Sequence, residues 1–335
     1  MPTRSGPHFD WAVTALAAAF TGGVYLDGWA HTHGRVDETF FTPWHAVLYA
    51  AFAAMAALLA GRAAWGVARD GAPWRRAMPE GYGLSLLGVG GWVLGGPFDA
   101  VWHSVFGFEA GVEALMSPAH AVLALGFGLM ASGPLRAGFR RPSQGWWREL
   151  PMLLSLTFVV SILTFFTQIA HPIANLWGSA VAPASQEGVE LGIAGTLLTV
   201  VILTAPLLLL LRYGRLPTGG TSILVGLNAF AMGFLYDRGP YPRTVVAATV
   251  AAAVAADLLR AGLRADAARP RAFRTFAFAL PLGLTLAYFA SLAVKSGITW
   301  SPHLWIGVVV FAGAVGWLLS YLVLAPIVTE SRTDT

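Results

Sequence analysis

Long runs of apolar residues, separated by short polar segments, recur along the whole chain of 335 residues. Ten of these runs approach or exceed the roughly 20 residues that a helix needs to cross the hydrocarbon core of a bilayer. The expected spans are 10–32, 44–68, 81–105, 118–138, 149–172, 188–212, 219–236, 242–264, 273–294 and 302–326. The pattern predicts an all-α fold, a polytopic transmembrane helical bundle of about ten helices that forms one integral membrane domain over residues 1–335.

The composition agrees with a bilayer environment. Hydrophobic residues make up 56% of the chain and charged residues only 11%, whereas soluble domains have roughly a quarter charged residues. The lipid bilayer is therefore the first expected partner. The formal charge of +4 does not indicate nucleic acid binding, because the Arg residues lie in short loops between the apolar runs. We interpret the first run as a helix that is retained, not a cleaved signal peptide.

Lys and Arg are divided unevenly between alternate loops. The two terminal segments and every second loop together contain 17 of the 21 Lys and Arg residues. The other loops contain only Arg35, Arg238, Arg243 and Lys295. Because positive residues accumulate in cytoplasmic loops, the chain is expected to be a multi-pass protein of the cell membrane with both termini in the cytoplasm.

A motif occurs twice among the first four expected helices. Each copy contains an Asp, a His four residues later, a loop Glu, a hydroxyl residue followed by Pro, and a second His. The first copy consists of Asp27, His31, Glu38, Thr42, Pro43 and His45, and the second of Asp99, His103, Glu113, Ser117, Pro118 and His120. Residues 10–68 and 81–138 are therefore expected to form pseudo-repeated helical hairpins. Residues 149–326 are expected to form three further hairpins.

The later hairpins contain only fragments of this motif. His171, with Glu187 and Glu190 after it, occupies the corresponding place in the third hairpin, and Ser301-Pro302-His303 begins the last helix. The sequence assigns no role to these residues.

The spacing of the motif brings its polar side chains together. Asp27 and His31 are four residues apart and share one face of a helix, as do Asp99 and His103. The second His of each copy lies at the start of the following helix. Each hairpin thus presents an Asp and two His at one membrane level, on the outer face. Packing of the two hairpins by pseudo-symmetry would make all four histidines converge.

Part of the motif has a purely structural explanation. A Ser or Thr followed by Pro is a common helix start, and Glu38 and Glu113 favour the positive ends of helices. The histidines are not explained in this way, and ionisable groups at membrane depth are costly and usually functional. We therefore interpret six residues as a metal set, the Asp residues being either ligands or acceptors for the second ring N–H of a ligating His. The six are Asp27, His31, His45, Asp99, His103 and His120.

The available ligand types narrow the choice of metal. The chain has no cysteine, which excludes thiolate sites, disulfides and Cys nucleophiles. Imidazole together with carboxylate suits copper(II), zinc or iron.

The spacing Asp-x3-His-x13-His of Asp27, His31 and His45 resembles the copper-ligand pattern of the C subunit of particulate methane and ammonia monooxygenases. The second copy, Asp99, His103 and His120, keeps the first spacing but has three more residues before its last His. The resemblance covers about a quarter of the chain, and ten helices exceed the number in that subunit. It implies copper, oxidative chemistry and additional membrane subunits as partners. A homo-oligomer is the other partner arrangement that the sequence leaves open.

The favoured hypothesis is a membrane metalloprotein, with copper as the first candidate, whose outward-facing site has oxidoreductase or monooxygenase-like character. Glu38 and Glu113 are then the candidates for catalytic proton relay. The sequence leaves open whether the protein is an enzyme. One alternative is a transporter or metal-handling protein, since repeated hairpins and intramembrane carboxylates also occur there. Another is a haem protein with bis-His ligation by the same four histidines.

Overall fold

The structure is a computed structural model that describes residues 5–35, 42–71, 73, 76–107, 111–143, 145–182, 185–237 and 240–325. The described residues form helices joined by short connections, with one isolated antiparallel bridge between Ser179 and Ile298. The helices are α1 (Pro7–Thr32), α2 (Pro43–Asp70), α3 (Gly83–Phe106), α4 (Val112–Met116), α5 (Pro118–Ala131), α6 (Gly133–Phe139), α7 (Trp146–Phe166), α8 (Pro172–Asn175), α9 (Gln186–Arg212), α10 (Gly220–Leu235), α11 (Pro240–Leu263), α12 (Pro270–Lys295) and α13 (Pro302–Val323).

Among the described residues, eight helices are long and apolar enough to cross a membrane. The pair α5 and α6 passes the same test as one bent span, and α10 is a shorter apolar helix. These ten segments coincide, within a few residues at most ends, with the ten spans expected from the apolar runs. The all-α, polytopic, multi-pass fold is thus confirmed.

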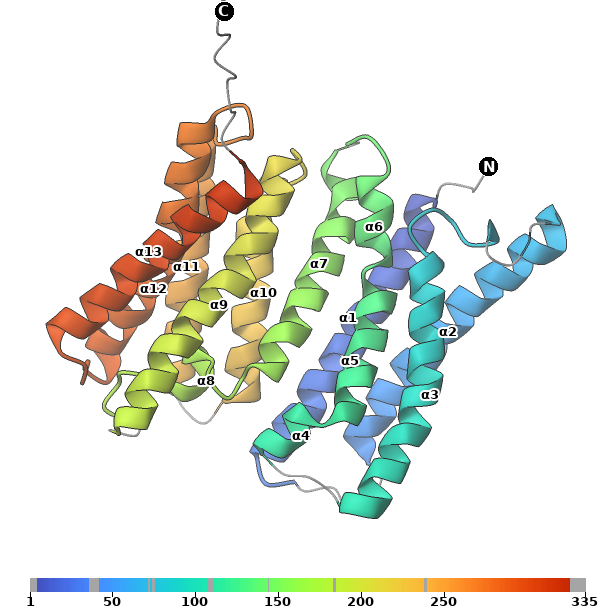
Figure 1. Ribbon diagram of the computed structural model, residues 1–335, viewed down its shortest axis with the longest axis horizontal. Helices are drawn as coiled ribbons and strands as arrows, with labels where there is room; N and C mark the ends of the chain where they lie inside the picture. The colour runs from blue at the N-terminus through green and yellow to red at the C-terminus, as the bar shows by residue number, and fades with distance from the viewer. Residues whose placement is uncertain are drawn as a thin grey trace, which may run out of the picture.

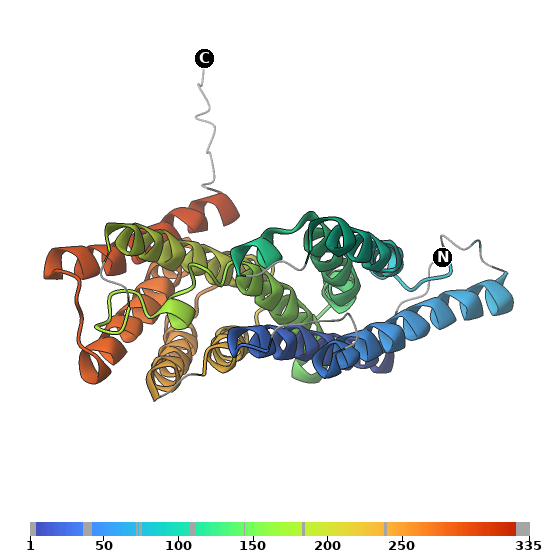
Figure 2. The same cartoon turned by 90° about the horizontal axis from the view of Figure 1, so that it is seen from below.

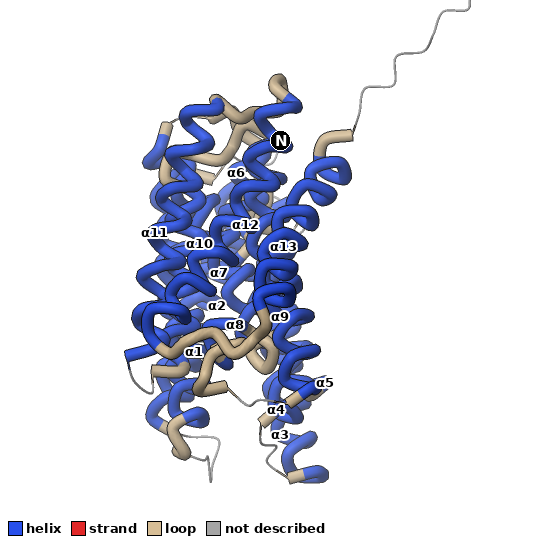
Figure 3. Tube along the Cα trace, turned by 90° about the vertical axis from the view of Figure 1, so that its left-hand side faces the viewer, coloured by secondary structure: helices blue, strands red, loops and turns tan. Residues whose placement is uncertain are grey.

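The long helices run roughly side by side, and the chain passes back and forth between two ends of the bundle (Figures 1 and 3). Helix α1 begins and α13 finishes at the same end, whereas α4 and α8 lie at the opposite end, called here the α8 end. An odd number of passes would have placed the two termini apart, so their common position agrees with an even helix count.

The helices divide into two groups along the long axis of the molecule (Figures 1 and 2). Residues of α1, α2, α3, α5 and α6 share one apolar core with α7. A second core joins α7 to α9, α10, α11 and α12. Helix α9 packs mainly against α13, and α7 mainly against α10, α6 and α1. The expected hairpin over 149–212 therefore consists of two helices that pack mostly against others.

The fourth expected span, 118–138, is bent by 41° between α5 and α6. The bend lies at Ser132, followed by Gly133 and Pro134. Pro has no N–H for the helical ladder, and Gly adds backbone freedom, so this dipeptide is a recognised cause of a sharp helix kink. Gly133 also lies against the ring of Tyr82, where a Cβ would approach within 2.4 Å of Cε1.

Aromatic contacts relate the first two hairpins to each other. Phe20 in α1 corresponds to Trp92 in α3, since both precede the motif Asp by seven residues, and Phe52 in α2 corresponds to Phe127 in α5. Phe20 stacks on Phe127 with ring centroids 4.3 Å apart, and Phe52 packs on Trp92 at 4.7 Å. Phe20 and Trp92 contact each other at 5.0 Å. Equivalent residues thus exchange partners, which is the contact pattern of an approximate two-fold axis.

Candidate metal centre

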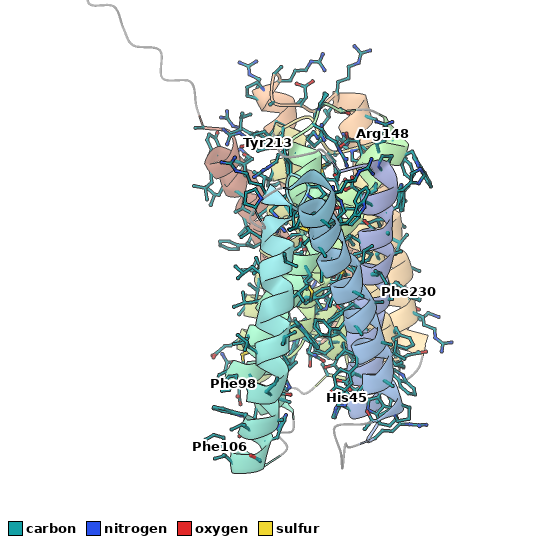
Figure 4. The ribbon with its side chains drawn as sticks, turned by 90° about the vertical axis from the view of Figure 1, so that its right-hand side faces the viewer. His45, Phe98, Phe106, Arg148, Tyr213 and Phe230 are labelled. Atoms are coloured by element: carbon teal, nitrogen blue, oxygen red, sulfur yellow. The ribbon has the colours of Figure 1, made fainter. Side chains whose placement is uncertain are left out.

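The first group of candidate ligands forms where α1 ends and α2 begins. Asp27 and His31 lie in the last two turns of α1, and His45 is the third residue of α2. The Thr42 side chain accepts a hydrogen bond from the His45 backbone N–H, so the capping expected from Thr-Pro holds here. In Figure 4, His45 lies at one end of the bundle, whereas Arg148 and Tyr213 lie at the other end.

The second group forms at the corresponding place in the second hairpin. Asp99 and His103 lie in the last two turns of α3, and His120 is the third residue of α5. The expected capping by Ser117 is wrong: its hydroxyl makes no capping hydrogen bond and is buried without a partner.

In both groups one carboxylate oxygen lies near two imidazole nitrogens. Asp27 Oδ1 is 3.7 Å from His31 Nε2 and 3.1 Å from His45 Nε2. Asp99 Oδ1 is 3.5 Å from His103 Nε2 and 3.4 Å from His120 Nε2. Within each group all three donor atoms lie within 4.8 Å of one another. We call the two sets the Asp27 triad and the Asp99 triad.

The same small-residue contact brings the helices of each hairpin together near its triad. Gly23, one turn before Asp27, lies against the backbone of Leu48, where an added Cβ would be 3.0 Å from Leu48 Cα. Gly95, one turn before Asp99, lies against Leu123, at 2.8 Å from Cδ2 by the same measure. Leu48 and Leu123 each follow the second motif His by three residues. The close approach of the two helices lets a carboxylate on one reach an imidazole on the other.

Backbone carbonyls orient the histidines of the Asp99 triad. His103 Nδ1 lies 3.1 Å from the carbonyl oxygen of Gly107, and His120 Nδ1 hydrogen-bonds to the carbonyl oxygen of Ala114 in α4. A carbonyl can only accept, so Nδ1 carries a proton in both rings. In a neutral imidazole the lone pair is then on Nε2, which in both rings is the nitrogen nearest Asp99 Oδ1.

In this arrangement the two Nε2 lone pairs and the Asp99 carboxylate oxygen repel one another unless a positive charge lies between them. The charge can be a metal ion held by all three atoms, or protons on Nε2 that make both rings imidazolium. In the Asp27 triad, Oδ1 is buried and makes no hydrogen bond of acceptable geometry, although His45 Nε2 is only 3.1 Å away.

The two triads differ in access to solvent. The His31 side chain is 41% exposed, whereas that of His103 is 9% exposed. Asp99 is correspondingly more buried than Asp27. The second histidines show the opposite order, since the His45 side chain is 17% exposed and that of His120 is 29% exposed. The most exposed histidine is thus His31 in the Asp27 triad and His120 in the Asp99 triad.

The predicted convergence of all four histidines into one centre is wrong for this structure. The donors that lie within 4.8 Å of one another form two separate groups of three. The physical reason is that each Asp lies close to the His of its own hairpin, because α1 packs on α2 and α3 packs on α5.

The other candidate residues lie outside the triads or outside the described structure. Glu38 is not among the described residues. Glu113 is exposed on α4; what this helix contributes to His120 is the carbonyl of the next residue, Ala114. His303, Glu187 and Glu190 are exposed at helix starts, and in the described residues they belong to no group of three metal-type donors.

His171 is fully buried and differs from the triad histidines. Its Nδ1 accepts a hydrogen bond from the Ile173 backbone N–H at the start of α8. Burial lowers its pKa to about 3, so the ring is neutral at physiological pH. Its sequence position suggested another copy of the motif, but the structure gives it a different environment.

Comparison with protein-family models, with curated proteins and with solved structures finds no match to this chain. The geometry of its own residues is accordingly the basis for a functional assignment.

Proposed function

We propose that this protein is a membrane metalloprotein that binds one transition-metal ion at each triad, two ions per chain. The observation that carries the proposal is the convergence, in two equivalent hairpins, of one carboxylate oxygen and two imidazole Nε2 atoms. In the Asp99 triad the tautomers set by Gly107 and Ala114 direct lone pairs toward the shared centre. Ligating histidines are typically oriented by such carbonyl contacts.

The distances fit a first-row metal. Metal–nitrogen and metal–oxygen bonds of about 2.0–2.2 Å give tetrahedral donor–donor distances of roughly 3.3–3.6 Å, since these are about 1.63 times the bond length. The four Asp–His distances range from 3.1 to 3.7 Å and surround that value. Three protein donors leave a further position for water or substrate, as in catalytic metal sites.

Copper is the first candidate metal. An imidazole and carboxylate site binds copper(II) most tightly among the divalent first-row ions, and the spacing of the Asp27 triad resembles a copper-ligand pattern. Zinc and iron use the same donors. Copper with an open position would supply redox or oxygen chemistry, which supports an oxidoreductase or monooxygenase-like activity as the favoured function.

The haem alternative fits the geometry less well. A bis-His haem needs the porphyrin plane between two Nε2 atoms. Asp99 Oδ1 lies 3.5 and 3.4 Å from the two Nε2 atoms of its triad, so the carboxylate occupies that space. An apolar macrocycle would also have to bury this charge, which is costly.

Metal handling is the second candidate, and the exposure of His31 favours it. A triad with one histidine side chain 41% exposed can take up an ion directly from solution. Passage through the bundle is less supported, since at the opposite end Arg141 forms an ion pair with buried Asp10, and Tyr82 donates to the other oxygen of that carboxylate at 2.6 Å.

Elemental analysis of the full-length protein, purified in detergent without chelator, tests the proposal. Copper, zinc or iron at up to two equivalents per chain is expected. If the metal is copper(II), its electron paramagnetic resonance spectrum should be that of copper bound by nitrogen and oxygen ligands. A strong Soret absorption band would support haem instead. Protein that contains no such metal, and takes up none when each ion is added, would rule out the proposal.

A further inference from the structure

A cavity of about 50 Å³ lies in the second half of the bundle, and no residue of the two triads lines it. Residues of α8, α9, α10, α11 and α12 surround it, among them Thr196, Val225, Asn228, Ala229 and Leu284. The residues that line it in the described structure include no Asp, Glu, Lys or Arg. Its walls are largely aliphatic, and His171 lies at its boundary.

His171 lines this cavity and has a hydrogen-bond donor without a partner among the described residues. Its Nδ1 accepts from the Ile173 backbone N–H at 3.2 Å, so in the neutral ring the proton is on Nε2. His171 is only 2% exposed. Its Nε2 atom is buried and has no hydrogen-bond partner among the described residues. Buried donors are nearly always satisfied in native proteins, so this N–H requires an acceptor that the described residues do not provide.

Other polar groups of the lining already have partners within the protein. Thr196 Oγ1 donates to the Gly192 carbonyl, and Thr285 Oγ1 to the Pro281 carbonyl. Tyr288 donates its hydroxyl to the Trp177 carbonyl. Asn228 donates Nδ2 to Thr164 Oγ1 at 2.6 Å. Thr199 and Thr249 also line the cavity, but its surface is largely apolar. Because a buried water typically has about three polar partners, a ligand with an apolar body suits this lining better than water alone.

We propose that the cavity binds a small uncharged molecule with one oxygen acceptor on a compact apolar body, such as a short-chain ketone or ether. The oxygen accepts a hydrogen bond from His171 Nε2–H, and the apolar body contacts the aliphatic walls. A charged ligand is excluded because the lining holds no counter-charge. An apolar cavity of about 150 Å³ accepts benzene, so this ligand is smaller. The site is independent of metal binding at the triads.

Acetone and isobutene provide a matched pair of probes, since they have nearly the same shape and only acetone has an acceptor. The full-length protein, labelled with ¹⁵N in the histidine imidazoles, is titrated with each probe in detergent. The His171 Nε2–H resonance is identified by its loss in His171→Gln. Acetone should shift this resonance saturably, and isobutene should bind at least about fivefold more weakly, the factor expected for one ordinary hydrogen bond.

Two variants that fill the cavity keep the test interpretable if one of them does not fold. Ala229→Leu and Thr199→Leu each add volume to the lining and leave His171 intact. Either folded variant should lose the acetone response. The proposal is overturned if acetone gives no saturable shift, if both probes bind equally, or if the response persists in the filled variants. Magnetisation transfer from water to Nε2–H that acetone does not reduce would assign the cavity to water and also overturn it.

Discussion

His120 Nδ1 hydrogen-bonds to the carbonyl oxygen of Ala114, six residues earlier in the chain. Ala114 belongs to α4, a helix of 5 residues between α3 and α5. The contact fixes which nitrogen of His120 faces Asp99. A short helix without a candidate ligand of its own thus orients an imidazole of the Asp99 triad.

Leu115→Pro tests the role of this carbonyl. A residue that precedes Pro is driven out of the helical region, so the Ala114 carbonyl should rotate away from His120. Metal affinity at the Asp99 triad should fall about 10- to 100-fold, the usual effect of losing such an orienting contact. Leu115→Ala removes the same side-chain packing but leaves the backbone, and should keep the affinity, measured by competition with a metal chelator. Equal affinities in the two variants would contradict the account.

The buried ion pair of Asp10 and Arg141 should stabilise the opposite end of the bundle. Asp10 in α1 contacts Arg141, which follows α6, and also accepts from Tyr82 at the start of α3. Asp10→Ala leaves a buried guanidinium without its partner and should cost about 3–5 kcal/mol of unfolding free energy. The double variant Asp10→Ala/Arg141→Ala should lose less than the sum of the single variants. Additive losses, measured by denaturant unfolding in detergent, would show that the two groups act independently.

His171 should make the protein less stable in acid. Its pKa is about 3 in the folded state and about 6.5 when unfolded, so between these values the unfolded chain binds the extra proton. The contribution of His171 to the free energy of unfolding is therefore constant above pH 6.5. Below pH 6.5 this free energy falls by about 1.4 kcal/mol per pH unit as the pH decreases toward 3. His171→Asn keeps a capping acceptor and should flatten this dependence. His303→Asn, at an exposed position, should leave it unchanged; the same acid slope in both variants would refute the assignment.

The membrane orientation follows from the uneven distribution of Lys and Arg and remains a prediction. The chain has no cysteine, so a single introduced thiol reports its own position. Val112→Cys at the α8 end should react with an impermeant thiol reagent in intact cells, whereas Ser143→Cys at the other end should react only after permeabilisation. Both side chains are exposed. The reverse pattern would place the triads on the cytoplasmic side.

The spans could be predicted from the sequence because each apolar run is bounded by Pro, Gly or polar residues that end a helix. The bend at Gly133-Pro134 had a local signal of the same kind. The short helices α4 and α8 had none, since five or four residues are too few for a periodicity. Their placement depends on tertiary contacts, such as the His171 cap of α8.

The sequence also predicted which three residues form each triad. It did not predict that the two triads would be separate. A spacing of four puts Asp and His on one helix face, and Pro at the first helical position puts the second His in the first turn. Which hairpin a carboxylate faces depends on helix packing. Here Gly23 and Gly95 bring helices together within each hairpin, while Phe20 and Trp92 occupy the contact between hairpins. A one-dimensional pattern does not specify that choice.

Binding of one ion at each triad can be tested by measuring the metal content of wild type, His31→Gln, His103→Gln and the double variant. An amide is a far poorer metal ligand than imidazole but retains hydrogen-bonding capacity, so all four proteins should remain folded in detergent. After loading with copper(II) and removal of excess, we expect about two ions per chain in wild type, one in each single variant and none in the double variant. Equal copper content in all four folded proteins would contradict binding of one ion at each triad.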